Sequence, residues 1–252
     1  MSVDLVVDGT VAVITLNRPE RKNAFTREQY DAFGAHLDDI ASRDDVHVAV
    51  VTGAGGSFSS GQDLKEMAEM ANAVSSGSST STSATDSSGT GTGFTVLLDA
   101  LQRFPKPLLA AVEGVAVGIG MTLLPYCDIV IVGATARMRV PFSELGVPPE
   151  AGSSALLADL VGWQRAAEIL LTSRWVDADQ AVDYGLALER VDDGLALARC
   201  LDIARVIGEK SAYSTRVIKQ LMVAARGSRS TDARAREEAL FAELFRGGGY
   251  GG

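Results

Sequence analysis

The same local design occurs at two places in this chain: an apolar strand ends in glycines and small residues, and a helical pattern follows at once. The two segments are GGSFSSGQDL at residues 55–64 and GVAVGIGMT at residues 114–122. The start of a helix offers N–H groups without partners, and small side chains let a ligand approach that backbone. Two such N–H groups aimed at one oxygen form an oxyanion hole. For either loop alone, the simpler interpretation is that glycine makes a tight turn.

Hydrophobic spacing predicts the order of the elements around these loops. Strands are expected at residues 3–9 and 10–19, joined by an Asp-Gly turn, and at residues 46–53. Helical spacing covers residues 27–45 and 94–107. The stretch 108–140 is predicted to run from a strand through a glycine turn and a short helix to another strand, and the pattern from residue 151 onward is nearly all helical. The sequence therefore predicts an α/β fold, a strand-and-helix body followed by a helical C-terminal region.

The charge balance narrows the choice of partners. The chain carries 23 Lys and Arg against 32 Asp and Glu, and this acidic balance disfavours nucleic acid, because phosphate binding needs a basic surface. No run reaches the ~18 apolar residues of a membrane span, and the acidic N-terminus is unlike a signal peptide. Cys127 and Cys200 form no visible disulfide framework, and no cluster of metal-ligand type is present. We expect a cytoplasmic protein with no metal, nucleic-acid or membrane partner.

A low-complexity segment, VSSGSSTSTSATDSSGTGTG, occupies residues 74–93. Such a composition cannot offset its ordering entropy by burial. A surface insertion between two helices is the simpler interpretation, because long insertions change loop-closure entropy only slightly. A mobile flap over a site is the alternative.

Glu150 stands out in the stretch GVPPEAGSS at residues 146–154, where two prolines lead into it and small residues follow. An acid in the first turn of a helix is stabilised by the helix dipole by about 0.3–1 kcal/mol, which suffices to explain an ordinary surface acid. The alternative is that Glu150 is the base of an active site. Apolar walls would then raise its pKa toward neutrality, and Phe142, Leu145 and Val147 are the candidate walls.

Three motifs, in this order, resemble those of the crotonase superfamily, the enoyl-CoA hydratase/isomerase family. NRPERKNAF is similar to its strand exit near bound CoA, SFSSGQDLKEM to its first oxyanion loop, and PLLAAVEGVAVGIGMTLLPYCDIVI to its second. The resemblance covers residues 3–245 and implies a spiral of β-β-α units with the CoA site over residues 1–195. It further implies a helical region over residues 196–252 that serves trimer assembly, covers CoA and ends in a flexible glycine-rich tail. The expected assembly is a homotrimer or a dimer of trimers.

The same resemblance implies the residues of the site. The oxyanion donors would be the backbone N–H groups of Gln62 and Ile119, and Ile119 stands where the family usually has Ala or Gly. The other implied contacts with the acyl-CoA thioester are Lys22, Ala24, Ser60, Asp63, Leu64, Gly118 and Phe142, with Lys219 and Phe241 from a neighbouring subunit. No separate cofactor is expected, because CoA is part of the substrate.

Missing carboxylates distinguish the reactions of this family. Its hydratases hold a water between two glutamates, and the corresponding residues here are Thr122 and Phe142, neither of which can act as a base. PFSELGVPPEAGSS instead resembles the Δ3,Δ2-enoyl-CoA isomerases of peroxisomal type, in which the acid at the position of Glu150 is the catalytic base. The resemblance thus implies an isomerase of unsaturated fatty-acid breakdown. The alternatives are hydration or another acyl-CoA enolate chemistry, and a non-catalytic acyl-CoA-binding protein.

The remaining acids are interpreted structurally. Asp63 is expected to cap the helix that follows it, and Asp128 to fix a turn. Glu144 is expected to face solvent or form a salt bridge, and Glu237 and Glu238 are expected on the solvated face of the last helix.

Overall fold

The computed structural model of the chain describes residues 2–63, 65–66 and 91–246. Leu64 therefore lies outside the described residues, and so does the low-complexity segment except for its last three residues, which begin a helix. Among the described helices, none is both long enough and apolar enough to span a membrane.

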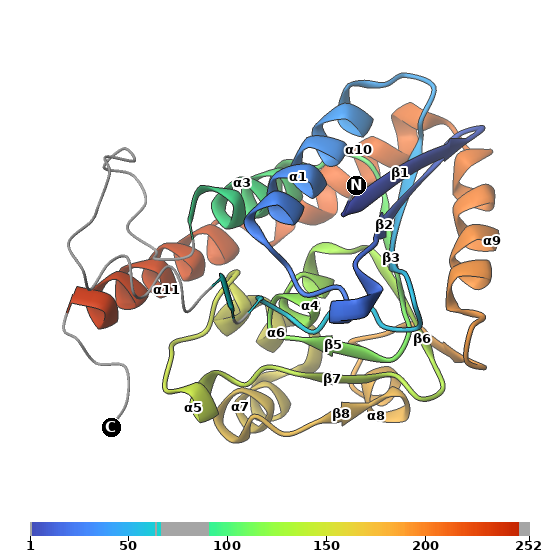
Figure 1. Ribbon diagram of the computed structural model, residues 1–252. Helices are drawn as coiled ribbons and strands as arrows, with labels where there is room; N and C mark the ends of the chain where they lie inside the picture. Colours follow the sequence, from blue (N-terminus) through green and yellow to red (C-terminus); the bar gives the residue numbers. More distant parts are fainter. Residues whose placement is uncertain (1, 64, 67–90, 247–252) are drawn as a thin grey trace.

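A six-stranded sheet forms the centre of the fold (Figure 1). Its strand order is β1-β2-β3-β4-β6-β9, with β1 and β2 antiparallel and every other neighbouring pair parallel. The strands are β1 (Val3–Asp8), β2 (Val11–Leu16), β3 (Val48–Gly53), β4 (Leu108–Val112), β6 (Ile129–Gly133) and β9 (Glu189–Val191). A second, three-stranded sheet has the order β5-β7-β8 and consists of β5 (Val115–Val117), β7 (Arg137–Arg139) and β8 (Val176–Asp177).

The central strands are apolar on both faces because helices cover both faces. In β3, Val48 and Val50 pack with the cluster beneath α9, whereas Ala49 and Val51 belong to the larger core under α1 and α3. This alternation follows from the two-residue period of a strand. Figure 1 shows α9 on one side of the sheet and α1 and α3 on the other.

The helices of the described residues differ in length: seven have nine residues or more, and the others have six or fewer. The long ones are α1 (Arg27–Ser42), α3 (Gly91–Arg103), α6 (Ser153–Val161), α7 (Trp163–Thr172), α9 (Ala196–Gly208), α10 (Ala212–Ala225) and α11 (Arg229–Arg246). The short ones are α4 (Ile119–Thr122), α5 (Phe142–Leu145) and α8 (Ala178–Asp183), with the 3-10 turns η1 (Pro19–Arg21) and η2 (Leu124–Tyr126). A capping box fixes the start of α1, in which Thr26 and Gln29 each bind the backbone of the other.

The path of the chain confirms the predicted β-β-α spiral. From β4 in the large sheet the chain enters β5 in the small sheet, passes through α4, and returns to the large sheet as β6. The next turn repeats the course, with β7 in the small sheet followed by α5. In each turn of the spiral, the strand of the small sheet leads into a short helix, α4 after β5 and α5 after β7 (Figure 1).

The second half is nearly all helical, as predicted, apart from two short strands. β8 and β9 were not predicted because strands of two and three residues carry almost no periodic signal. Of the two interpretations of Glu150, the one that placed it in the first turn of a helix is wrong, since α6 begins only at Ser153. Ala151 and Gly152 between them both have left-handed backbones, with φ of 60° and 70°, so Glu150 lies on a loop.

Candidate active site

The two glycine loops lie side by side, joined by backbone hydrogen bonds. The N–H of Ser59 donates to Val115 O at 2.9 Å, and the N–H of Val117 donates to Ser59 O at 2.9 Å. Gly61 has a φ of +93°, and a methyl group added there would lie 2.9 Å from Val117 O. Glycine is therefore required at residue 61 by both its backbone conformation and the closeness of the second loop.

Each loop presents one backbone N–H that its own loop does not use. Phe25 bridges the first loop by donating to Gly61 O at 2.7 Å and accepting from the N–H of Asp63 at 2.8 Å, which turns the N–H of Gln62 to the opposite side. Ile119 is the first residue of α4, so its N–H has no partner within the helix. Within the described part of the chain, neither N–H has a hydrogen-bond acceptor. These are the two donors that the sequence predicts.

Glu150 reaches the space beside these donors. A methyl group added at Gly118 would lie 4.0 Å from Glu150 Oε1 and 3.9 Å from Gly61 Cα. The carboxyl group of Glu150, Gly61 and Gly118 therefore surround one small space. Gly118 keeps that space open, and its φ of +53° also favours glycine.

The surroundings of Glu150 favour a protonated carboxyl group. Burial, and secondarily the charge of Glu237, raise the pKa of Glu150 to about 8. Burial raises the pKa of the Tyr30 hydroxyl on α1, and the charge of nearby Glu150 raises it further. That hydroxyl donates to Gln62 Oε1 at 2.5 Å, and the Tyr30 ring stacks on Phe25 with centroids 4.9 Å apart.

Of the three predicted walls, the structure buries one fully. Phe142 is buried at the start of α5, and Val147 is partly buried against the core. Leu145 is 48% exposed, so it does not wall off the carboxyl group of Glu150 from solvent. The buried Tyr30 and Phe25 supply apolar surface that the local sequence around Glu150 does not show.

The NRPERKNAF segment is tied to the first oxyanion loop by residues that sequence reasoning missed. Asn23 is fully buried, and its Nδ2 donates to Ala54 O at 2.9 Å and to Ser57 O at 2.7 Å. Arg18 pairs with Asp63 at 2.6 Å. Lys22 and Asn23 have left-handed backbones, with φ of 49° and 56°, which are uncommon for residues other than glycine. Because Asn adopts this conformation more readily than most residues, Asn23 was the available signal in the sequence.

The residues implied to contact CoA gather along this tie. Lys22 is exposed and its carbonyl accepts from the N–H of Ser60 at 2.9 Å, while Ala24 is buried. The hydroxyl of Ser60 donates to Arg21 O at 3.1 Å. These residues lie together, as the resemblance implies, and their contact with CoA stays a prediction.

Asp63 caps the helical turn after it, which confirms its predicted structural role. Its Oδ1 accepts from the N–H groups of Lys65 at 3.0 Å and Glu66 at 3.3 Å. Burial raises the pKa of the Asp63 carboxyl group. The hydrogen bonds from Arg18 and from the backbone outweigh that effect and lower this pKa below its ordinary value.

The structure confirms the role expected of Glu144 and corrects those expected of Asp128 and Glu237. Asp128 accepts from the N–H of Leu108, 20 residues away, at 2.7 Å, so it links the starts of β4 and β6 instead of fixing a local turn. The exposed Glu144 pairs with Arg139, as predicted. Glu237, expected on a solvated helix face, is 4% exposed. It was misassigned because two adjacent glutamates look alike in sequence, although only one of them faces the protein.

Lys219 and Phe241 do not have the positions expected of free helpers at a neighbouring site. Lys219 is buried, donates to Lys106 O at 2.7 Å and pairs with Asp128 at 2.9 Å. These partners lie beside the start of β4, whereas the chain leaves for Gly118 from the other end of that strand. Phe241 is buried on α11 within its own chain.

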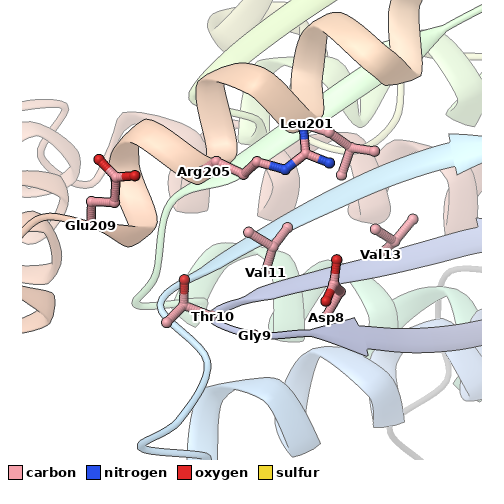
Figure 2. A pocket seen from close by; sticks show the side chains of 8 residues that line it. All are labelled: Asp8, Gly9, Thr10, Val11, Val13, Leu201, Arg205 and Glu209. Carbon is pink, nitrogen blue, oxygen red and sulfur yellow. The ribbon is translucent and has the colours of Figure 1, made fainter.

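A cavity of about 330 Å³ lies elsewhere, between the β1–β2 turn and α9 (Figure 2). Its lining residues are Asp8, Gly9, Thr10, Val11, Val13, Leu201, Arg205 and Glu209. Thr10 and Val11 begin β2, at the end opposite the NRPERKNAF segment, so this cavity is separate from Glu150. Within the described residues, no group of three or more His, Cys, Asp or Glu side chains could hold a metal ion.

Comparison with known proteins assigns the family. The model of the family described as enoyl-CoA hydratase/isomerase matches residues 7–248. The chain belongs to the enoyl-CoA hydratase/isomerase family. Its membership confirms the family resemblance carried by the three motifs.

Individual members of this family show how far the similarity extends. The 1,2-epoxyphenylacetyl-CoA isomerase of Escherichia coli (strain K12) is 32% identical over 85% of this chain and 79% of its own length. Enoyl-CoA delta isomerase 2 of Rattus norvegicus is 38% identical over 72% of this chain but only 44% of its own length. A crystal structure of an enoyl-CoA hydratase/isomerase from Pseudoalteromonas atlantica T6c has a TM-score of 0.85 at 31% identity, covering 96% of this chain and 91% of that one.

Family membership by itself does not distinguish isomerisation from hydration, because other relatives are named hydratases. The site residues narrow the choice. The two positions that the resemblance assigns to the hydratase glutamates hold buried, uncharged side chains, with Thr122 2% and Phe142 5% exposed. The resemblance assigns a catalytic acid to three positions, those of Thr122, Phe142 and Glu150. Only Glu150 is an acid in this chain.

Proposed function

We propose that this enzyme is a Δ3,Δ2-enoyl-CoA isomerase, which moves a double bond of an acyl-CoA thioester from position 3 to position 2. The observation that carries the proposal is the placement of a single carboxyl group, that of Glu150, across Gly118 from Gly61. The N–H groups of Gln62 and Ile119 lie next to these glycines. A double-bond shift needs one base and one oxyanion hole, and the site offers this set.

The proposed reaction is a proton transfer with no net change in atoms. Ionised Glu150 removes a proton from C2 of the 3-enoyl thioester, and the electron pair of that C–H bond spreads into a dienolate. The N–H groups of Gln62 and Ile119 donate to the thioester oxygen, where the negative charge gathers. Protonated Glu150 then returns its proton to C4, which leaves the double bond between C2 and C3.

The pKa of Glu150 suits both halves of this cycle. A base whose pKa of about 8 lies near the operating pH can accept a proton and release it with little loss of driving force. An ordinary surface glutamate would be a weaker base at the same position. We assign CoA to the exposed edge formed by Lys22, Ala24, Ser60 and Asp63, and no cofactor beyond the substrate is needed.

The experiment that tests this function compares two substrates under the same conditions. With a 3-enoyl-CoA, we expect the absorbance of a conjugated 2-enoyl thioester to appear at an enzyme-like rate. With a 2-enoyl-CoA, we expect much slower formation of the 3-hydroxyacyl product, because no second carboxylate positions a water. Faster hydration than isomerisation would make the enzyme a hydratase, and binding of both thioesters without turnover would make it a non-catalytic binder.

We further propose that the enzyme assembles as trimers, alone or as paired trimers, through α10. This helix leaves Ile218, Leu221 and Met222 56%, 67% and 63% exposed. Neighbouring large apolar side chains of this exposure mark an interaction surface. Each such side chain, if fully buried, would contribute about 1.5–3 kcal/mol.

The assembly is tested by replacing Leu221 and Met222 together with Glu. Light scattering is expected to show a trimer or hexamer for the wild type and a smaller species for the variant. Val6→Glu is the matched control, since Val6 is 61% exposed on a different element, β1, and it should leave the mass unchanged. A wild-type monomer, or an unchanged mass for the α10 variant, would refute assembly through α10.

A further inference from the structure

The loop that carries Glu150 needs external support. Ala151 has a φ of 60°, a conformation that is unfavourable for a residue with a Cβ atom, and Gly152 follows with a φ of 70°. Helix α6 begins directly afterwards at Ser153, and its first N–H groups have no partners within the helix. Such a loop keeps one shape only if surrounding groups bind its backbone.

Glu237 of α11 supplies that support from the far end of the chain. Its Oε2 accepts from the N–H of Gly152 at 2.6 Å, and its Oε1 accepts from the N–H of Ser154 at 2.9 Å. The side chain is 4% exposed, so these charge-assisted hydrogen bonds form away from water. On the other side of the loop, the hydroxyl of Tyr126 donates to Ala151 O at 2.8 Å.

Helix α11 is itself fixed in place by polar contacts. Arg234, 7% exposed, pairs with Asp99 of α3 at 2.6 Å and with Glu238 at 2.6 Å. Arg229 pairs with Asp159 of α6 at 2.9 Å. Glu237 is therefore delivered to the loop by a helix anchored to two other elements, and its two bonds are not an isolated surface contact.

We propose that Glu237 is a positioning residue for the reaction: it clamps the Ala151–Gly152 turn so that the carboxyl group of Glu150 is held across Gly118 from Gly61. This inference rests on the proposed role of Glu150 as the base. Glu237 touches no reacting atom and acts only through the backbone of the loop and through its charge.

The charge of Glu237 adds a second consequence, which a purely structural clamp would lack. Glu150 is faced by Glu237 from α11 and by Tyr30 from α1. Glu237 is faced by Glu238 on its own helix, and Tyr126 and Arg234 lie in the same cluster. Since the negative charge of Glu237 opposes ionisation of Glu150, removing it lowers the pKa of Glu150.

The test is Glu237→Gln, which keeps the shape of the side chain but offers one acceptor oxygen instead of two. For the wild type, kcat/KM is expected to rise with pH through about 8, because Glu150 must be ionised. In Glu237→Gln we expect kcat to fall by about 10- to 100-fold from misplacement of the base. Its KM should change little, and its acidic limb should move to lower pH.

Two further variants separate positioning from general damage. Glu243→Gln removes an exposed charge from the same helix, and its kcat and acidic limb should match the wild type. Glu237→Asp keeps the charge, so its acidic limb should stay near that of the wild type even if kcat falls. Thermal unfolding of each variant reports whether it is folded, and the Asp variant tests the clamp if the Gln variant does not fold.

The outcomes also separate this inference from the proposed function. If the wild type isomerises and Glu237→Gln retains both its kcat and its acidic limb, the role of Glu237 is overturned while that of Glu150 stands. If the wild type does not isomerise, amide hydrogen exchange still decides whether Glu237 clamps the loop. The N–H groups of Gly152 and Ser154 should exchange faster in Glu237→Gln than in Glu243→Gln, and equal exchange would refute the clamp.

Discussion

Glu150→Gln is expected to lower turnover of a 3-enoyl-CoA by about 10²–10⁴-fold, the range that a lost general acid–base group typically gives. The amide keeps nearly the same shape but cannot accept the proton from C2. The oxyanion donors and the CoA-binding edge are unchanged, so binding of a saturated acyl-CoA should persist. The measurement pairs turnover of the 3-enoyl-CoA with equilibrium binding of the saturated thioester.

Glu144→Gln is the matched control for this variant. Glu144 lies six residues away, is exposed and pairs with Arg139, so its replacement should leave turnover near that of the wild type. If Glu150→Gln turned over as fast as the wild type, Glu150 would be an ordinary loop acid. A large loss in Glu144→Gln instead would move the base to that residue.

The stability of Glu150→Gln checks that its loss of activity is chemical. Because burial raises the pKa of Glu150 from 4.5 to about 8, the folded chain keeps a proton that the unfolded chain releases. The stability of the wild type therefore falls between these two pH values as pH rises. Gln does not titrate, so the variant is expected to unfold at a higher temperature than the wild type at pH 9.

Gly118→Ala is expected to lower turnover by about 10²–10³-fold, the loss typical of a disabled oxyanion hole. Its methyl group would lie 4.0 Å from Glu150 Oε1 and 3.9 Å from Gly61 Cα, which are ordinary contact distances. The methyl group therefore meets no clash and would occupy the space proposed for the thioester, but the φ of +53° and ψ of −123° at Gly118 strain the backbone of any residue with a Cβ atom. Steady-state kinetics with a 3-enoyl-CoA measure the effect.

Gly9→Ala controls for backbone strain in this experiment. Gly9 has a φ of +57°, close to the +53° of Gly118, but an added methyl group would meet nothing within 4 Å. Both variants place a Cβ atom at a positive φ, and the ψ of −123° adds to the strain at Gly118, so the unfolding temperature of each variant is measured beside its activity. Similar unfolding temperatures with activity lost only in Gly118→Ala would locate the effect in the reaction space. Equal activity of the two would contradict the assigned space.

The oxyanion loops were predictable because their requirements are local. A positive φ and the closeness of neighbouring backbone or side chains both favour glycine at residues 61 and 118, so these requirements are visible in the sequence as Gly61 and Gly118. Glu150 was predictable only through the resemblance, since its neighbours in sequence suggest a helix start. Local propensities do not predict the left-handed turn at Ala151, because hydrogen bonds with Tyr126 of η2 and Glu237 of α11 hold it.

Contacts between distant elements account for the remaining errors. Glu237 was missed as a buried residue, although Ala233, Glu237 and Phe241 recur every four residues and all three are buried. That spacing was the available signal for a polar group on an inward face. Lys219 shows the opposite case, in which an apparent surface lysine is drawn inside by Asp128 and the carbonyl of Lys106.

The hydrogen bond between Gly152 and Glu237 joins residues 85 positions apart, and this has a consequence for biosynthesis. As the ribosome extends the chain, the oxyanion loops and the proton-accepting loop emerge long before the helix that steadies the latter. A nascent or truncated polypeptide that lacks α11 would bear every reacting group and still perform the chemistry poorly. Full activity then has to wait until α11 has been synthesised and has docked on the loop.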